Sequence, residues 1–199
     1  MFVITSDQRD SRSSADLVPV ALASVHAKGH RGLALAPERT AGDEVQVAVA
    51  DAAALLEIVL DLTRSGTWSV GVGAGEVESP LPDSVRAARG EAFVNARDAV
   101  DRAKKAATRV AITAPEGGAD AEALVRLLVE LRDRRTAEGW EIYDLLAEGI
   151  TQREAAARLG ISEGAVSLRV KSAGLRTEEA AVPALVRVLA RLSPGPVPD

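Results

Sequence analysis

The chain of 199 residues contains no cysteine, which excludes disulfide bonds and zinc sites built from cysteine thiolates. Its two histidines are too few for a histidine-rich metal site. Aromatic residues make up only 3% of the sequence, although the hydrophobic content is 47%. Alanine, valine and leucine must therefore build the hydrophobic cores. The length suits one large domain or two small ones.

The sequence also lacks a long uninterrupted hydrophobic run. The most apolar stretch, Val45–Leu62, is interrupted by acidic residues and cannot form a membrane span. The first ten residues have neither the basic start nor the apolar segment of a signal peptide. We therefore expect a cytoplasmic protein with no membrane partner.

Residues 1–114 alternate between strand and helix patterns, which predicts an α+β domain. The order of elements is that of the split βαβ or ferredoxin-like plan, extended by one helix and one strand. That plan predicts an antiparallel sheet with helices covering one face. The expected strands are Phe2–Ser6, Arg31–Ala36, Val45–Ala50, Trp68–Gly75 and Arg109–Thr113, and the expected helices are Ser14–Lys28, Asp51–Arg64 and Gly90–Ala107.

Residues 115–119 are rich in proline and glycine and are predicted to be a linker. The following residues, 120–193, are predicted to form an all-α domain. Its expected helices are Asp120–Arg135, Glu138–Ala147, a short pair within Thr151–Gly174, and Glu178–Leu192. The proline-rich tail, 194–199, is expected to be disordered.

The segment Thr151–Gly174, TQREAAARLGISEGAVSLRVKSAG, has the spacing of two short helices joined by a tight turn. Gly160 falls where such a turn needs a left-handed backbone, which glycine adopts at no steric cost. The other diagnostic positions are two N-caps, a small residue at the helix crossing and three inward-facing apolar residues: Thr151, Ser162, Ala156, Ile161, Val166 and Val170. The alternative interpretation is an ordinary helical hairpin.

This segment resembles the helix-turn-helix of sigma-factor region four and of LuxR-type response regulators. The resemblance implies that Ser162–Lys171 is a recognition helix that enters the major groove of double-stranded DNA. The residues expected nearest the base edges are Ser162, Glu163, Gly164, Ser167, Leu168 and Lys171. The residues expected to contact phosphate oxygens are Thr151, Gln152, Arg153, Arg169 and Arg176.

The net charge of −5 is unusual for a DNA-binding protein. Within residues 151–177, however, five basic residues stand against two acidic ones, a local net charge of +3. A basic face of this size neutralises few phosphates, so we expect weak binding by one copy and a homodimer on two half-sites. The leucine stripe of Asp120–Arg135 and the last helix are each interpreted as either core packing or a dimer contact.

In residues 1–114, two aspartates are expected at neighbouring strand ends. Asp7 follows the first strand, and Asp43 lies in the hairpin before the third. Paired carboxylates of this kind hold Mg²⁺ or Mn²⁺ with a nucleotide triphosphate, and Gly42 leaves room for a phosphate. The alternative interpretation is that aspartate commonly ends strands and fills turns.

Short motifs in the same region resemble class III nucleotide cyclases, and still more the SatD family. The family patterns D-x-x-G-S-R and G-D-E-F-Q correspond here to DQRDSR, Asp7–Arg12, and GDEVQ, Gly42–Gln46. Gly71–Glu76 and Gly90–Arg97 add to the likeness, and actinobacterial members are expected to carry a C-terminal helix-turn-helix. The resemblance implies a cyclase-like palm domain with Asp7 and Asp43 as metal ligands and with Gly42, Asp43 and Asn95 at a nucleotide.

The sequence departs from the cyclase pattern at two positions that matter for catalysis. Cyclases place an arginine four residues after the asparagine, whereas here Ala99 follows Asn95 at that offset. Arg97 is only two residues away, roughly 200° around a helix, and should point elsewhere. The lysine expected before the hairpin glycine is absent. Losing such an electrostatic clamp costs on the order of 10²–10³ in rate, so no catalytic residue is predicted.

These patterns lead to one main hypothesis and two alternatives. The main hypothesis is a dimeric DNA-binding transcription regulator whose cyclase-like domain serves dimerisation or nucleotide sensing. One alternative is a nucleotidyl cyclase or other nucleotide-processing enzyme with an appended DNA-binding module. The other is a protein-interaction module, which the acidic net charge favours.

Overall fold

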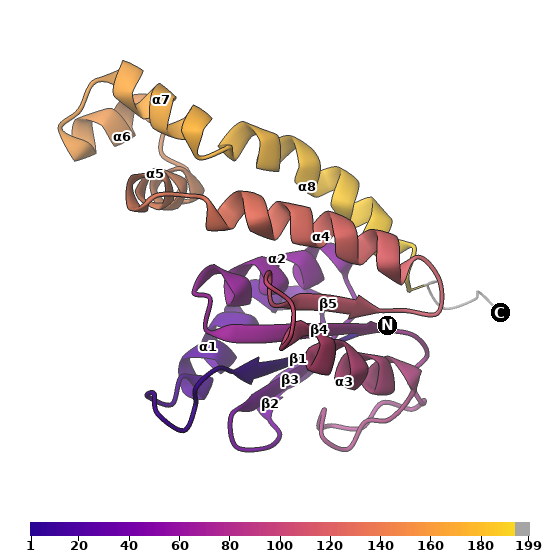
Figure 1. Cartoon of the computed structure of the whole chain (residues 1–199). Helices are drawn as coiled ribbons and strands as arrows, with labels where there is room; N and C mark the ends of the chain where they lie inside the picture. Colours follow the sequence, from indigo (N-terminus) through magenta and orange to yellow (C-terminus); the bar gives the residue numbers. More distant parts are fainter. Residues whose placement is uncertain (194–199) are drawn as a thin grey trace. The chain divides into compact units, whose positions relative to one another are not determined.

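The computed structural model describes residues 1–193 and shows an α+β protein with a mixed five-stranded sheet (Figure 1). The predicted tail, 194–199, lies outside the described residues. The chain divides into two compact units. Within residues 1–193, the sheet unit comprises Met1–Arg126 and Leu185–Ser193, and the helical unit comprises Leu127–Ala184. Among the described residues, no helix is both long enough and apolar enough to cross a membrane.

The helices and strands follow the predicted order, with ends shifted by a few residues. The strands are β1 Phe2–Gln8, β2 Leu33–Arg39, β3 Glu44–Val49, β4 Trp68–Ala74 and β5 Val110–Thr113. The α-helices are α1 Val18–Gly29, α2 Ala52–Arg64, α3 Glu91–Ala103, α4 Gly118–Asp133, α5 Ala137–Ala147, α6 Gln152–Leu159, α7 Glu163–Ser172 and α8 Leu175–Ala190. Because α4 begins at Gly118, it includes the end of the range predicted as linker.

The strand order in the sheet is β2-β3-β1-β4-β5, with β1 at the centre. β1 is antiparallel to both β3 and β4, and β2 is antiparallel to β3. The expectation of a wholly antiparallel sheet is wrong for the last pair, because β5 is parallel to β4. The cause is the connection between them: a helical crossover through α3 returns the chain in the same direction.

The expectation that helices cover only one face of the sheet is also wrong. Gly71 and Gly73 of β4 lie against the backbone of α3, so close that a Cβ on Gly71 would stand 2.2 Å from the Val100 nitrogen. Val70 and Val72 alternate with these glycines, point to the other face and are fully buried. On that other face α2 contacts β4 and packs against α1. The two faces therefore have separate cores.

A buried group of charges connects three helices of the helical unit. The carboxylate of Glu178 in α8 accepts hydrogen bonds from the guanidiniums of Arg132 in α4 and of Arg135, which follows α4. Both guanidiniums lie about 5 Å from the rings of Trp140 and Tyr143 in α5. All three charged side chains are at least nine-tenths buried. This arrangement fixes α5 and α8 against the end of α4.

Candidate functional site

Local hydrogen bonds define α6, α7 and the turn between them. Thr151 and Glu154 form a capping box at the start of α6, with the Thr151 hydroxyl accepting from the Glu154 nitrogen at 3.2 Å. Hydrogen bonds from the Thr151 backbone and hydroxyl lower the pKa of Glu154. Gly160 ends α6 in the left-handed conformation, at φ 65°. Ser162 caps α7 by accepting from the Ala165 nitrogen at 3.2 Å. The caps and turn predicted from the sequence are therefore confirmed.

One face of α7 is buried against α5 and α6, as the spacing of its valines predicts. The shared core consists of Ile142 and Leu145 from α5, Ala155 and Ala156 from α6, and Val166 and Val170 from α7. The opposite face is exposed, and Leu168 keeps 67% of its surface accessible. All the residues predicted to face base edges lie on this exposed side: Ser162, Glu163, Gly164, Ser167, Leu168 and Lys171.

The residues predicted to contact phosphates differ in their exposure and in whether they already form ion pairs. Arg153 and Arg176 are exposed and form no ion pair within residues 1–193, and the same holds for Lys171. Arg169 instead donates to Glu141 of α5 at 2.8 Å. Thr151 is exposed within its capping box, whereas Gln152 is half-buried. Of the five basic residues in 151–177, Arg158 and Arg169 form ion pairs, and three have no ion-pair partner among residues 1–193.

A second site lies where β1 ends and β3, β4 and β5 begin. Here a hollow of about 520 Å³, called below the β1-end hollow, is lined by both predicted metal ligands, Asp7 and Asp43. The strand pairing explains the convergence, because Asp7 is registered with Glu44 and the Gln8 nitrogen donates to the Asp43 carbonyl at 3.1 Å. The remaining lining residues are Gln8, Arg9, Asp10, Ser11, Arg12, Ser13, Ser69, Lys104 and Arg109.

The two aspartates in this arrangement do not fit a divalent metal ion. The ammonium of Lys104 lies 2.8 Å from Asp7 Oδ2, and the Ser11 hydroxyl donates to the Asp43 carboxylate. A metal would have to displace both partners. Among the described residues, no group of three histidine, cysteine, aspartate or glutamate side chains is placed to hold a metal ion. Lys104 was not foreseen from the sequence, because it lies far from Asp7 along the chain and no motif connects them.

The other residues predicted at a nucleotide site do not join the hollow. Asn95 donates to the carbonyl of Ala74 at 2.8 Å, at the end of β4 opposite to Ser69. The five-residue separation along β4 corresponds to about 17 Å. Gly42 occupies a positive-φ turn position at φ 51°, and nothing lies within 4 Å of the point where a Cβ would stand, so its conformation serves the hairpin. Of the predicted nucleotide ligands, only Asp43 lines the hollow.

Arg97 points to a different strand from Asn95, as the helical geometry predicts. Its guanidinium donates to Glu44 Oε2 at 2.5 Å, and Thr40 donates to the other oxygen of the same carboxylate. Glu44 is 7% exposed. Arg97 is thus committed to an ion pair between α3 and β3 and is not free to contact a phosphate.

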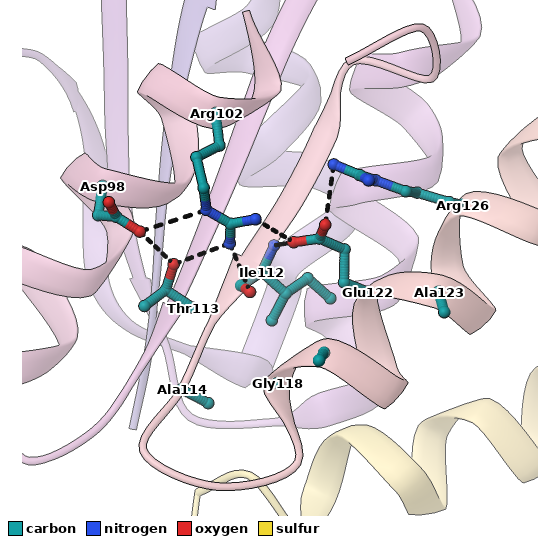
Figure 2. A pocket seen from close by; sticks show the side chains of 10 residues that line it. Asp98, Arg102, Ile112, Thr113, Ala114, Gly118, Glu122, Ala123 and Arg126 are labelled. Atoms are coloured by element: carbon teal, nitrogen blue, oxygen red, sulfur yellow. Dashed lines mark hydrogen bonds and ion pairs between the residues drawn. The ribbon is translucent and has the colours of Figure 1, made fainter. Parts of the chain in front are cut away.

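Another hollow, of about 460 Å³, lies between α3, β5 and α4 and is lined by a network of charged side chains (Figure 2). Glu122 accepts from the Ile112 nitrogen, from Arg102 and from Arg126, each at 2.8 Å. Arg102 also donates to the Ile112 carbonyl at 2.9 Å, and Arg126 donates to the Val110 carbonyl at 2.9 Å. These side chains satisfy the backbone groups along the outer edge of β5. The network therefore has a structural role at the edge of the sheet.

Replacing Glu122 with alanine is expected to lower the free energy of unfolding by about 1–3 kcal/mol, because the buried Ile112 amide loses its acceptor. Hydrogen exchange at that amide should accelerate together with those of Val110 and Thr113. Glu116→Ala removes the same charge from an exposed position and is the matched control. Unchanged exchange at Ile112 in the Glu122 variant would contradict the structural role.

Comparisons of the chain with protein-family models, with curated proteins and with solved structures found no match. The geometry of the two surfaces described above therefore carries the functional inference. The exposed face of α7 is built on a well-packed helical core. The β1-end hollow gathers charged groups from three connections of the sheet.

Proposed function

We propose that the protein is a DNA-binding transcription regulator and that α7 enters the major groove. The observation that carries this proposal is the exposed outer face of α7, a helix whose other face is buried against α5 and α6. The capped start of α7 supports it further, since recognition helices contact base edges mainly with their first turns. In this proposal the α6–α7 pair is a helix-turn-helix, and the sheet unit has a ferredoxin-like or cyclase-like plan that is not catalytic. Such a regulator would work in the cytoplasm.

The chemistry of the exposed face suits base reading. Glu163 is placed to accept from a cytosine amino group, and Ser167 is able to bond to either base of a pair. Leu168 exposes an apolar side chain, which favours contact with a thymine methyl group. Gly164 allows close approach of the DNA, because nothing but Ser162 Oγ, at 3.9 Å, lies near its missing Cβ.

The charge of the helical unit favours binding as a homodimer. The unit contains eight basic and ten acidic residues, a net charge of −2. If Arg153, Lys171 and Arg176, which have no ion-pair partner among residues 1–193, each neutralise one phosphate, one copy would bind with a log–log salt slope of about −3. Two copies on paired half-sites would double the magnitude of that slope and would bind DNA more tightly than one copy.

Fluorescence polarisation with genomic fragments at low salt tests the proposal. Lys171→Ala is expected to weaken binding and to reduce the magnitude of the salt slope by about 1 per copy, because one phosphate contact is lost. The matched control is Arg134→Ala, which removes an exposed positive charge elsewhere in the same unit. Equal losses in the two variants, or no binding by the unmodified protein, would overturn the proposal.

A protein partner for the same face is the second candidate function. The observation that favours it is the acidic net charge of the helical unit combined with the exposed Leu168. Leu168→Ala separates the two functions, because a protein interface buries such a side chain whereas DNA binding depends more on the free cations. Retention of DNA binding in that variant but loss in Lys171→Ala favours the DNA-binding function.

A further inference from the structure

The β1-end hollow holds more positive charge than its acidic partners neutralise. Lys104 forms an ion pair with Asp7 at 2.8 Å and approaches Asp101 at 3.9 Å. The three guanidiniums that line the hollow have no carboxylate oxygen within ion-pair distance among residues 1–193. Its basic residues are Arg9, Arg12, Lys104 and Arg109, and its acidic residues are Asp7, Asp10 and Asp43.

The loop that carries Arg9 and Arg12 is held in place by a buried glutamine. Gln8 is 3% exposed, and its amide oxygen accepts from the Leu17 nitrogen at 2.9 Å. The amide nitrogen donates to Ser14 Oγ at 3.0 Å and to the Ala15 carbonyl at 2.7 Å. The Gln8 side chain therefore ties the end of the loop back to its beginning. This restraint lowers the conformational-entropy cost of ordering the loop arginines around a ligand.

Two of the guanidiniums are anchored by a single nitrogen. Arg9 donates from Nη1 to the Gly66 carbonyl at 3.1 Å, and Arg109 donates from Nη1 to Ser69 Oγ at 3.3 Å. Each guanidinium carries five N–H donors, so most of them stay available. Partial loss of hydration lowers the pKa of Arg109, and repulsion by the positive charge of Arg9 lowers it further, while the Asp10 carboxylate acts in the opposite direction. A bound anion would relieve this repulsion.

We propose that the β1-end hollow binds the phosphate groups of a di- or triphosphate anion without a divalent metal ion. Lys104 is already paired with the Asp7 carboxylate, which a metal ion would need as a ligand. The guanidiniums of the lining arginines carry planar pairs of N–H donors, whose geometry matches two phosphate oxygens. The three guanidiniums without an ion-pair partner among residues 1–193, those of Arg9, Arg12 and Arg109, would then balance the phosphate charge that a metal ion balances elsewhere. This inference goes beyond the proposed DNA binding and does not depend on it.

Calorimetric titration of the full chain with sodium pyrophosphate in the presence of EDTA tests the proposal. Binding is expected without metal, and Arg12→Gln and Arg109→Gln should each weaken it about tenfold through the loss of charged hydrogen bonds. Lys105→Gln is the matched control, because Lys105 is exposed beside Lys104 but does not line the hollow. Circular dichroism establishes that each variant is folded.

Asp7→Asn distinguishes anion binding from metal binding. Removal of the carboxylate releases Lys104 toward the hollow, so pyrophosphate binding in EDTA is expected to be retained or to strengthen severalfold. A metal site would give the opposite result, with binding that requires Mg²⁺ and disappears in Asp7→Asn, and that outcome overturns the proposal. It is likewise overturned by an absence of binding at millimolar pyrophosphate, or by an equal loss in Lys105→Gln and Arg12→Gln.

Discussion

Replacing Glu178 with alanine is expected to destabilise the helical unit by about 3–5 kcal/mol, because it breaks a buried ion group that joins three helices. The substitution would remove the carboxylate that pairs with the buried guanidiniums of both Arg132 and Arg135. Arg135 already has one guanidinium nitrogen, Nη1, with no hydrogen-bond partner. Hydrogen exchange of the α5 amides during urea unfolding measures the loss.

Glu179→Ala is the control for this prediction, because Glu179 is the exposed neighbour of Glu178 on the same helix. Its effect should be close to zero, since exposed charges contribute little to stability. A second variant replaces all three buried charges with apolar residues of similar volume, which should recover most of the loss. A loss below about 1 kcal/mol in Glu178→Ala would show that the buried ion group does not hold the helices together.

Replacing Gly73 with alanine is expected to cost the sheet unit more than about 3 kcal/mol, because a single methyl group meets the backbone of α3. The added Cβ would lie 2.1 Å from the Ala92 carbonyl oxygen and 2.2 Å from the Ala96 nitrogen. Backbone atoms cannot rotate away as a flexible side chain does, so α3 must move as a whole. Hydrogen exchange of the β4 amides in increasing urea measures the loss.

Gly164→Ala adds the same methyl group where it meets no close atom and serves as the control. It should leave stability unchanged or raise it, since alanine favours a helix more than glycine does. A loss in Gly73→Ala no larger than in this control would mean that α3 does not pack directly on β4.

Helix caps and turns were predictable from the sequence because residues close together in the chain determine them. The caps Thr151 and Ser162 and the left-handed Gly160 follow from residue types at fixed offsets. The helix ends differ by a few residues, as at α1, which begins at Val18 beside Pro19 and not at Ser14. The parallel pairing of β5 was also open to prediction, since a strand, a helix and a strand in succession indicate a crossover.

Long-range side-chain partners were not predictable from one sequence. The pairs Lys104–Asp7 and Glu178–Arg132 join positions far apart in the chain, and periodicity shows only which face a residue occupies. The carboxylates Asp7 and Asp43 were expected to converge, and the strand register explains why both line one hollow. The partner of Asp7 is Lys104, the residue directly after α3, so predicting this ion pair would require knowing where α3 ends and how it packs on the sheet.

The charge network around β5 has a consequence for self-association. Outer strands are templates for fibril growth, because their unpaired backbone groups recruit strands from other molecules. Side chains of Arg102, Glu122 and Arg126 occupy those groups on β5, and Pro37 removes one N–H from β2 at the opposite border. These features disfavour edge-to-edge pairing of two sheets, and local unfolding that releases Glu122 would expose the Ile112 amide again.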